Sequence, residues 1–567
     1  MSMQSRGLFR LFIAVVFLLP AATQAQEPIT LEHAVVDERE LSHGGFFDYM
    51  VRLAVGESAD VVVHQRGVDV VVDVTAADGR LLDSIDSPTG RTGDEIVEII
   101  AKEAGTYRLR VRPFDGQEPV GKFVLEVRAL RTRGETEKLL QQRQHARDEA
   151  ATWLRRHGQM LKGPIENLGH GERIGPIDVL ARRSTVLAIG EATHGSREFG
   201  DVRLALTKYL VARHGYRVVA VEYSATKMRR LQDYVSGGQL ENKEVKELIE
   251  SGLWVGRRPL RQLVEWARAW NKHSQPEDRV VLVGVDAPEN VLSRAVLRSF
   301  LEKAYDGDEF MKQWPTVEKE IADADEQTAV FGDSGFSAGT RNFLIDVVAR
   351  LTLDRALLQA RFGRAAVDEA QNAAAVLAQF ADFNSGEANG KSRDWYMAVN
   401  ILAARRSPSD RVLYWAHNSH VATVRGGRFP STGAYLRQAI GCKYGAIALT
   451  FGEGAFVAQI PNDLEDRLAI NTLPPASEET IEGVARMAYP GAMVATWGCD
   501  GTGGVPEWLR IAHVMHWVGG LYSPSSLPSS ALRPFDLLAQ FDGIIFLPRV
   551  SAEEIPLNRP LIPARKR

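Results

Sequence analysis

The feature that most constrains the fold is a change in hydrophobic period about a quarter of the way along the chain. From about residue 30 to residue 130, apolar and polar residues alternate, as Tyr107, Leu109 and Val111 alternate with arginines in "TYRLRVR". Alternation is typical of strands with one face buried and the other in water. Asp78-Gly79 marks a hairpin turn between two such strands. This part of the chain predicts a small antiparallel β-sandwich.

Beyond a charged helix at Arg133–Gly158, apolar residues come in short continuous runs separated by helical segments. The runs are "STVLAIG", "RVVAVE", "RVVLVGVD", "RVLYWAH", "YGAIALTF" and "GIIFLP". Such strands indicate a parallel sheet covered on both faces. Residues 290 to 405 carry almost no strand signal and predict a helical insertion or cap. The expected fold class is α/β: a three-layer α/β/α parallel sheet with a helical insertion, preceded by a small antiparallel β-sandwich domain.

The N-terminus has the layout of a secretory signal. Arg6 and Arg10 precede a nine-residue apolar run, Leu11 to Leu19, and small residues follow up to Ala25. Nine residues are too few to cross a bilayer, which needs about 20. We expect cleavage after Ala25 and export to a periplasm or the cell exterior. An uncleaved anchor or a buried strand is the alternative interpretation.

These patterns give a domain organisation in five parts. We expect a signal peptide at 1–25, a β-sandwich accessory domain at 26–132, a helical linker at 133–165, a catalytic domain at 166–552 and a basic tail at 553–567. The sandwich resembles bacterial pre-peptidase C-terminal domains, which accompany many secreted hydrolases.

Composition argues against nucleic acid as a partner. The formal net charge is −4 and the sequence pI is near 6.4, so no global field attracts nucleic acid or anionic lipid. The two cysteines, Cys442 and Cys499, are too few for a disulfide framework and form no C-x-x-C pair. They either bridge one another or lie buried as small apolar side chains.

Polar side chains follow four of the expected strands. The first strand ends at Glu191 and His194, the second at Glu222, the third at Asp286, and the fourth at His417 and His420. Ligands of open parallel sheets bind beyond the carboxyl ends of the strands. Each residue alone is equally compatible with a helix cap or a satisfied core polar group, but the set predicts a site at this edge.

An amphipathic helix follows His194 and ends at Gly215. Its N-terminus brings N–H groups and positive potential to the same place, which suits an oxyanion or a carboxylate. Arg203, two turns into this helix, either points back toward the cluster or lies exposed. His214 is better interpreted as a C-terminal cap than as a chemical group.

The series Gly190 to Gly195, "REFGDVR", "VAVE" and "HNSHV" resembles the erythromycin esterase family. The similarity continues through "STGAYLRQAIGCKYGAIALTFGEGAF" and "FDLLAQFDGIIFL", and so covers about Ile165 to Leu547. The resemblance implies an α/β/α sheet with a helical cap and hydrolysis of an ester, in the best-known members a macrolide lactone. It places the general base at His194 with Glu191 beside it. Its supporting positions map onto Arg203, Glu222, His417 and His420.

The expected mechanism is activation of water by His194. A neutral imidazole takes a proton from water near neutral pH, and a carboxylate fixes its tautomer. Glu191 or Glu222 is the orienting carboxylate, and His417 or His420 is the oxyanion donor or leaving-group acid. The expected partner is a small-molecule ester or lactone, with no cofactor and no metal.

Three alternatives compete with this interpretation. The "GFSAG" segment matches G-x-S-x-G and offers Ser337 as a nucleophile, but no apolar strand precedes it. The cluster of His194, His417, His420 and the two glutamates is also able to supply metal ligands, although no zinc signature is present. The third alternative is that the protein is a non-catalytic exported scaffold whose sandwich binds glycans. Separately, Trp517 lies in a Gly-rich and Pro-rich region that we expect to border a substrate pocket.

Overall fold

The computed structural model divides the chain into two compact units, Met1–Thr136 and Glu137–Arg567. Helix α1 (Arg133–His157) crosses that boundary. The expected signal peptide and nearly all of the basic tail lie outside the described residues. No helix in the described part is long and apolar enough to span a membrane. The structure describes residues 27–86, 90–114, 119–169, 171–250, 257–287, 290–326, 336–385, 391–423, 430–461, 467–499, 504–523 and 531–554.

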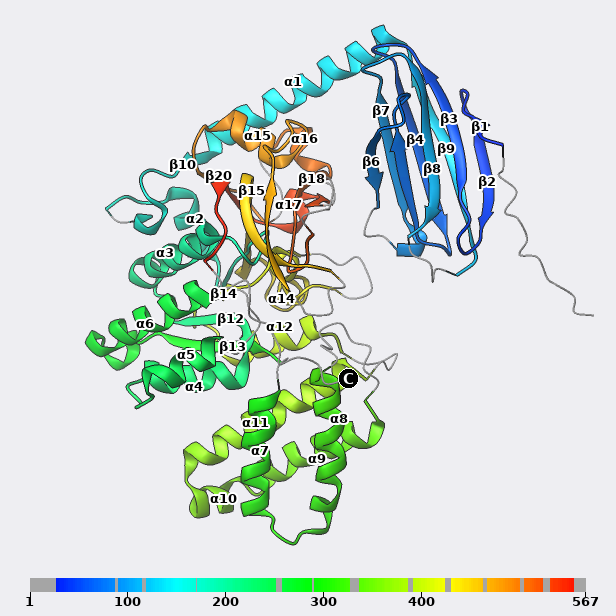
Figure 1. The fold of residues 1–567 in the computed structure, drawn as a ribbon. Helices are drawn as coiled ribbons and strands as arrows, with labels where there is room; N and C mark the ends of the chain where they lie inside the picture. The colour runs from blue at the N-terminus through cyan, green and yellow to red at the C-terminus, as the bar shows by residue number, and fades with distance from the viewer. Residues whose placement is uncertain are drawn as a thin grey trace, which may run out of the picture. The chain divides into compact units, whose positions relative to one another are not determined.

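The first unit is the expected β-sandwich, drawn in blue in Figure 1. One sheet has the order β1 (Ile29–Thr30), β3 (Phe47–Leu53), β8 (Gly105–Pro113), β5 (Val70–Thr75) and β6 (Leu81–Ile85). The other has the order β2 (Val36–Leu41), β9 (Gly121–Arg131), β4 (Ser58–Arg66) and β7 (Asp94–Ile100). All pairs are antiparallel except the two-residue pairing of β1 with β3.

The alternating residues of the sandwich face inward as expected. Tyr107, Leu109 and Val111 of β8 are buried in one apolar core with Phe123 and Leu125 of β9. Residues Asp78 and Gly79 form the turn of the β5–β6 hairpin, where Gly79 has a φ of 88°. A left-handed φ is strained for residues that carry a Cβ, which is why glycine suits this turn.

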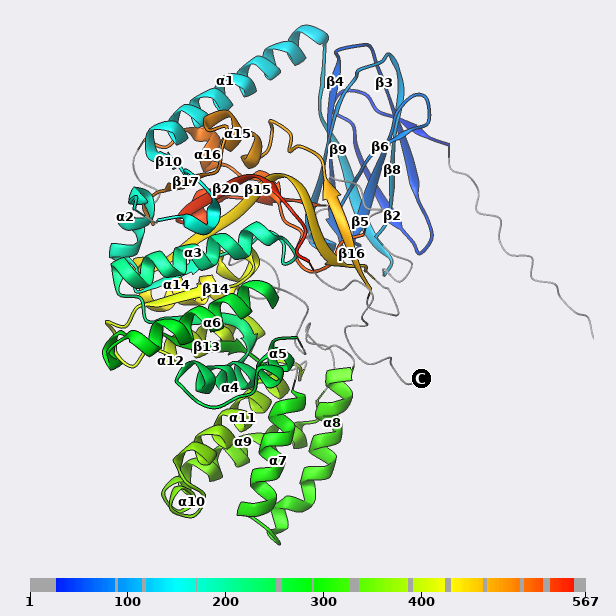
Figure 2. The same cartoon turned by 60° about the vertical axis from the view of Figure 1, so that its left-hand side comes forward.

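The second unit is built on one large sheet, and all six expected strands belong to it. Figure 2 shows the sheet between its helices. The strand order is β10 (Gly158–Met160), β17 (Met493–Thr496), β20 (Gly543–Val550), β15 (Tyr444–Gln459), β11 (Val186–Ile189), β14 (Val412–Trp415), β12 (Val218–Ser224) and β13 (Val281–Asp286), with β16 (Leu468–Leu473) paired to β15. The strands from β20 to β13 are parallel, whereas β10, β16 and β17 pair antiparallel with their neighbours. The sheet is therefore mixed: β10 and β17 form an antiparallel edge, and β16 pairs with the C-terminal part of β15. These antiparallel strands were not expected.

Helices cover both faces of this sheet and give the expected three layers. Leu187 and Ile189 of β11 pack on one face against α2 (Gly175–Arg183), α3 (Arg197–His214), α4 (Ala225–Val235), α5 (Asn242–Glu250) and α6 (Arg257–His273). Val186 and Ala188 pack on the other against α1, α12 (Arg393–Ala403), α13 (Asn418–Val421), α14 (Thr432–Ile440), α15 (Ile481–Ala488), α16 (Glu507–Arg510) and α17 (Leu537–Gln540). A separate ribbon pairs β18 (His513–His516) with β19 (Leu532–Phe535).

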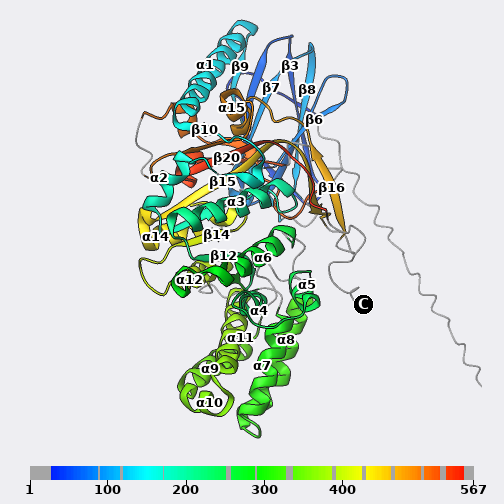
Figure 3. The same ribbon diagram turned by 90° about the vertical axis from the view of Figure 1, so that its left-hand side faces the viewer.

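The helical insertion is confirmed and has an apolar core of its own. Figures 1 and 3 show its helices gathered beyond the β13 edge of the sheet. It contains α7 (Val291–Ala304), α8 (Trp314–Glu326), α9 (Ala338–Leu353), α10 (Arg355–Phe362) and α11 (Arg364–Phe383). The chain returns to the sheet through α12, and the first turn of this helix carries two residues of the site described below.

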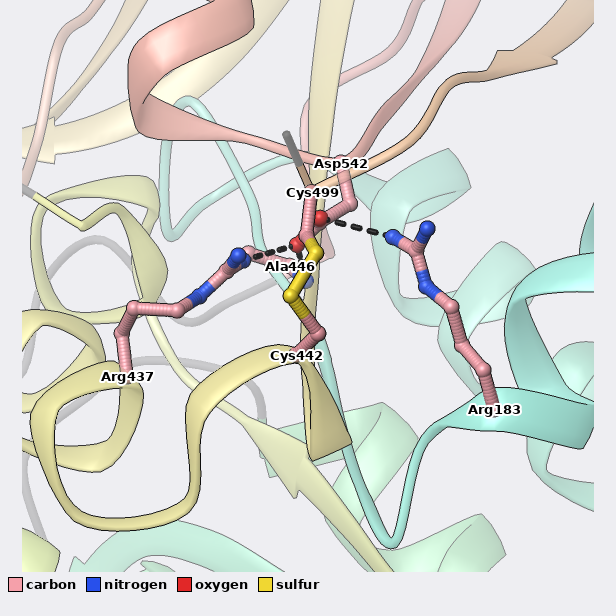
Figure 4. The surroundings of a disulfide bond; sticks show 6 residues. All are labelled: Arg183, Arg437, Cys442, Ala446, Cys499 and Asp542. Atoms are coloured by element: carbon pink, nitrogen blue, oxygen red, sulfur yellow. Dashed lines mark hydrogen bonds and ion pairs between the residues drawn. A yellow bond between two sulfur atoms is a disulfide. The ribbon is translucent and has the colours of Figure 1, made fainter. Parts of the chain in front are cut away.

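Cys442 and Cys499 form a disulfide, which decides between the two possibilities that the sequence left open. It joins the start of β15 to the segment after β17. Figure 4 shows Asp542 beside it, with its carboxylate held by Arg183 and Arg437. Asp542 also accepts the backbone N–H of Ala446. Together, the disulfide and the contacts of Asp542 connect the segments that precede β15, follow β17 and precede β20.

Candidate active site

The carboxyl ends of four neighbouring parallel strands bring the expected residues to one edge. β11, β14, β12 and β13 are adjacent, and Trp415 of β14 is in register with both Ile189 and Val221. Residues that follow these positions therefore meet in space although they lie far apart in the sequence. They form two groups: the Glu191 end (Glu191, His194 and Arg203) and the Glu222 end (Glu222, Arg393, Asp394 and His420).

Two glycines allow the loop between β11 and α3 to leave the core. A Cβ at Gly190 would lie 2.0 Å from Oδ1 of Asn418, and one at Gly195 would lie 2.0 Å from the carbonyl oxygen of Val457. The loop is held by backbone hydrogen bonds from Val518 to Ala192 (2.8 Å) and from Val457 to Gly195 (3.1 Å). His194 therefore sits on a backbone that is fixed on both sides.

The Glu191 end is a chain of three side chains. His194 Nδ1 lies 2.9 Å from Glu191 Oε1, and Arg203 Nη2 lies 2.7 Å from the other oxygen, Oε2. Because an ionised carboxylate only accepts, Nδ1 carries the proton and Nε2 presents its lone pair. Side-chain exposure is 16% for His194 against 7% for Glu191 and for Arg203, so the histidine is the part within reach of solvent. Arg203 points toward the cluster, which decides between its two expected orientations.

The Glu222 end is a buried network of opposite charges. Glu222 Oε1 lies 3.0 Å from Arg393 Nη2 and 3.3 Å from His420 Nε2, while Oε2 accepts the backbone N–H of His417 at 3.0 Å. Burial acts to raise the pKa of Glu222, but His420 and Arg393 hold that pKa well below its ordinary value. Glu222 is therefore an anion whose oxygens are engaged by Arg393, His420 and the backbone of His417. The structure favours Glu191 over Glu222 as the orienting carboxylate.

His420 is held as a cation by two carboxylates. Its Nδ1 lies 2.7 Å from Asp394 Oδ1 and its Nε2 faces Glu222. Burial acts to lower the pKa of His420, but the two anions raise it to about 10. Asp394 also accepts the backbone N–H and the hydroxyl of Thr432, each at 2.7 Å. With both nitrogens engaged by anions, His420 is arranged to stabilise Glu222 rather than to transfer protons.

His417 lies between the two ends and is neutral. Its Nδ1 accepts from the backbone N–H of Ser419 at 3.2 Å, so the ring proton is on Nε2, 3.3 Å from the carbonyl oxygen of Ala192. Burial, and then the charge of His194, lower the pKa of His417 well below its ordinary value. Its ring centroid is 5.0 Å from that of His194 and 4.9 Å from that of Trp517. Trp517 thus contacts His417, but neither residue is among those that line the cavity described next, so the expected border of the pocket by this region stays a prediction.

A small cavity opens between the two ends. It has about 40 Å³ of space for the centres of water molecules, and the smallest volume that holds a water is about 10–15 Å³. The site is therefore large enough to hold a hydrolytic water beside His194. The lining residues are Glu191, His194, Arg203, Val221, Glu222, Tyr223, Pro259, Leu260, Trp415 and Ala416.

Arg393 and Asp394 are the site residues that sequence reasoning missed. Arg393 Nε donates to Asp286 Oδ1 at 2.9 Å, so the third strand end joins the network through this arginine. Both residues begin α12 after the N-cap Ser392. An Arg-Asp pair in the first turn of a helix normally indicates only an exposed helix start, and we find no sequence signal that separates this pair from that case.

The structure places other candidate residues away from the site. Ser337 caps the N-terminus of α9, accepting from the N–H of Thr340, and its hydroxyl donates to Glu320 at 2.9 Å. This is a helix cap in the insertion and not a nucleophile after a strand, although Gly335 of the motif lies outside the described residues. His214 ends α3 and pairs with Asp178 at 2.6 Å. Within the described ranges, no group of three or more His, Cys, Asp or Glu side chains is arranged to hold a metal ion.

Comparison with known proteins decides the family. The family model described as "Erythromycin esterase" matches residues 211–550, more than half of the chain. The chain belongs to the erythromycin esterase family. The matched range contains Glu222, Arg393, His417 and His420, whereas the three residues of the Glu191 end precede it and join the site through their contacts.

Individual relatives support the same fold. Erythromycin esterase type I of Escherichia coli is 25% identical over 259 residues, which are 42% of this chain. The chain spans about three fifths (61%) of the length of that relative. A solved structure described as a succinoglycan biosynthesis protein matches 73% of this chain and 99% of its own, at 17% identity and a TM-score of 0.55. A mutant of erythromycin esterase EreC in its open conformation matches 67% of this chain and 94% of its own, at 18% identity and a TM-score of 0.50.

Proposed function

We propose that this protein is an exported hydrolase that cleaves a carboxylic ester or a macrolactone with water activated by His194, without a covalent intermediate. The observation that carries the proposal is the chain from Arg203 through Glu191 to His194, which ends at a cavity with room for water. Membership of the erythromycin esterase family supports the class of bond that is cleaved.

The first step is proton transfer from water to His194. Glu191 accepts the hydrogen bond from Nδ1–H, so Nε2 of the imidazole takes a proton from a water molecule in the cavity. The oxygen of that water forms a bond to the ester carbonyl carbon, and the carbonyl π electrons move to its oxygen. Glu191 stabilises the imidazolium that results, while Arg203 keeps the carboxylate in place.

The second step is collapse of the tetrahedral intermediate. The C–O bond to the leaving alcohol breaks, and the proton held by His194 Nε2 passes to the alkoxide oxygen. The Nε2–H of neutral His417 is the proposed donor to the oxyanion, because its bond to the carbonyl of Ala192 is long at 3.3 Å and is open to competition from a substrate oxygen. His420 keeps Glu222 paired and takes no proton in either step.

A macrolide or another lactone is the proposed substrate class. One relative is named erythromycin esterase type I, and a related solved structure is of erythromycin esterase EreC. The cavity has apolar walls from Pro259, Leu260 and Trp415 next to the charged groups. Its volume of about 40 Å³ suits a water and the bond that is cleaved, so the bulk of such a substrate would lie outside it.

Export is part of the proposal, and the disulfide supports it. Disulfides persist in oxidising compartments and are rare in the cytosol of mesophiles. The bond between Cys442 and Cys499 is consistent with a mature protein that begins at Gln26 in a periplasm or outside the cell. Sequencing the N-terminus of protein recovered from the periplasmic and culture fractions tests this. Recovery only from the cytosol, with residues 1–25 intact, would contradict export.

The experiment for catalysis screens the purified mature protein against macrolides and a panel of simple esters. Mass spectrometry should show addition of one water to the substrate, and pre-steady-state kinetics should show no burst of released alcohol. A burst with a stoichiometry of one would indicate a covalent intermediate and overturn the direct mechanism. Activity that disappears on prolonged chelation and returns with a metal would favour the metal-dependent alternative.

Glycan contact through the β-sandwich stays a prediction. The sandwich has a groove of about 360 Å³ beside β6 and β7, lined by apolar residues such as Leu82 and Ile99 and charged residues such as Arg80 and Glu103. Titration of surface glycans against the full-length protein and against a variant carrying Arg80→Ala tests whether this groove takes part.

A further inference from the structure

A buried carboxylate behind the Glu191 end has no role in the mechanism above. Glu553 follows β20 in the sequence and is 3% exposed. Its Oε1 accepts the backbone N–H of Arg258 at 2.9 Å, while Oε2 is buried and forms no hydrogen bond with any described residue. Buried carboxylate oxygens are normally satisfied, so an exception calls for a physical reason.

The segment that carries Glu553 is bound directly to the loop that carries His194. The backbone N–H of Glu553 donates to the carbonyl of Gly195 at 2.9 Å, and the N–H of Arg197 donates to the carbonyl of Ser551 at 2.9 Å. Ser551 is in turn bonded through its N–H to the carboxylate of Glu198 at 2.7 Å. Residues 551–553 thus bind the loop through its backbone at Gly195 and Arg197.

The charges around Glu553 belong to the catalytic centre. From α3, Arg203 attracts it, and from the β11 loop, Glu191 repels it. From α6, Arg258 holds it through its backbone, although the guanidinium of Arg258 is 2.7 Å from Asp201. Arg203 therefore lies within the electrostatic reach of two carboxylates, and only Glu191 has a direct bond to it at 2.7 Å.

We propose that Glu553 is a positioning residue of the catalytic centre: it fixes the His194 loop through its backbone and, by gaining or losing a proton, changes how strongly Arg203 supports Glu191. When Glu553 is protonated, Arg203 interacts with the negative charge of Glu191 alone. When Glu553 is ionised, Arg203 is attracted by two carboxylates. It then offsets less of the negative charge of Glu191, and His194 experiences a more negative potential. This inference deepens the proposed hydrolase and rests on that function for its catalytic meaning.

The charge state of Glu553 changes near neutral pH. Burial raises the pKa of Glu553 to about 7, with the contact to Arg258 acting in the opposite direction and Glu191 adding to the rise. A raised carboxyl pKa reduces stability as pH increases from 4.5 toward 7, because the unfolded chain ionises first. The loss of unfolding free energy is complete above pH 7 and absent below pH 4.5.

The test compares the wild type with Glu553→Gln, which keeps the shape and the acceptor for Arg258 but has no charge. Wild-type kcat/KM should show an ionisation near pH 7 that the variant lacks, with KM unchanged. Glu554→Gln is the matched control, because Glu554 is the exposed neighbour and should leave the profile as it is. A profile for Glu553→Gln identical to that of the wild type would overturn the proposal.

A second experiment, which does not measure activity, separates this inference from the proposed function. Melting temperature is measured from pH 4 to 9 for the wild type, Glu553→Gln, Glu191→Gln and the double variant. Glu553→Gln should be more stable than the wild type above pH 7 and equal to it below pH 4.5. In the Glu191→Gln background the difference should be smaller and should stop growing at a lower pH, since the repelling anion is gone and the folded-state pKa of Glu553 falls. An unchanged difference overturns the inference, whereas an inactive wild type with the smaller difference overturns only the hydrolase.

Discussion

The Glu191 end and the Glu222 end are both built from a buried carboxylate, a histidine and an arginine, yet they hold charge differently. His420 has a carboxylate against each nitrogen, at 2.7 and 3.3 Å, and is a permanent cation at neutral pH. His194 has Glu191 at Nδ1, and that carboxylate is shared with Arg203. Two carboxylates in direct contact with the buried ring are what hold His420 as a charged support.

The largest expected effect comes from removing the base. His194→Ala should lower kcat/KM by about 100- to 10,000-fold, because general-base catalysis is lost while the fold is kept. His214→Ala is the matched control: this histidine lies on α3 and also pairs with a carboxylate, Asp178, but outside the cavity. Kinetics with an ester substrate and melting temperatures measure both variants. Equal activity in His194→Ala and the wild type would remove His194 from the mechanism.

The second effect is on stability and belongs to the Glu222 end. Asp394→Asn leaves His420 with one carboxylate, and breaking a buried ion pair costs about 3–5 kcal/mol of unfolding free energy. Asp323→Asn is the control, since Asp323 pairs with Lys319 on the exposed surface of α8 and such pairs contribute little. Denaturant unfolding measures both. A loss in Asp394→Asn no greater than in the control would mean that the two ends are not different in kind.

The third effect is local to the Glu191 end. Gly195→Ala puts a Cβ 2.0 Å from the carbonyl oxygen of Val457, so the loop has to move. A displacement of about 1 Å costs about 100-fold in rate when catalytic groups must align. Gly339→Ala, where the nearest atom is 3.7 Å away, should have no effect on activity. If Gly195→Ala retains full kcat/KM, the backbone of this loop is not what positions the base.

The last effect is the pH dependence of stability above pH 6.5, which arises from His420 at the Glu222 end. The folded-state pKa of His420 is about 10, above its ordinary 6.5, so its contribution is full below pH 6.5 and is lost as pH rises toward 10. Urea unfolding between pH 6 and 10 should therefore give a steeper fall in the wild type than in His420→Gln. Parallel curves would show that His420 is not held as a cation.

The sequence predicted the strands and their polar ends because both follow from local pattern. Continuous apolar runs fixed the six central strands, and parallel strand ends placed Glu191, Glu222 and His417 together. The strand order and the antiparallel pairing of β10, β16 and β17 were not predictable, since packing between distant segments determines them. The sequence left open which glutamate orients His194, because both stand at neighbouring strand ends and only the contact at Nδ1 distinguishes them.

The missed part of the site has a similar cause. Arg393 and Asp394 follow the long helical insertion in the sequence and belong to the Glu222 end in space. The hydrophobic pattern does not indicate where the helix after the insertion begins. The sequence places Glu553 in a loose basic tail because the residues that follow it are Pro-rich and end in Arg-Lys-Arg. Glu553 is buried because its segment packs against the His194 loop, and this loop lies more than 350 residues earlier in the sequence.

The bridges from Thr193 to Gly519 and from Ser196 to Ala552 bear on the order in which the molecule is made. A nascent chain that has emerged as far as His420 already carries all six side chains inferred from the sequence, but not the later segments that brace the loop. Contacts between such distant parts form late in folding. Hydrolytic competence is thus expected only once synthesis is nearly finished, so that an incomplete chain stays inert.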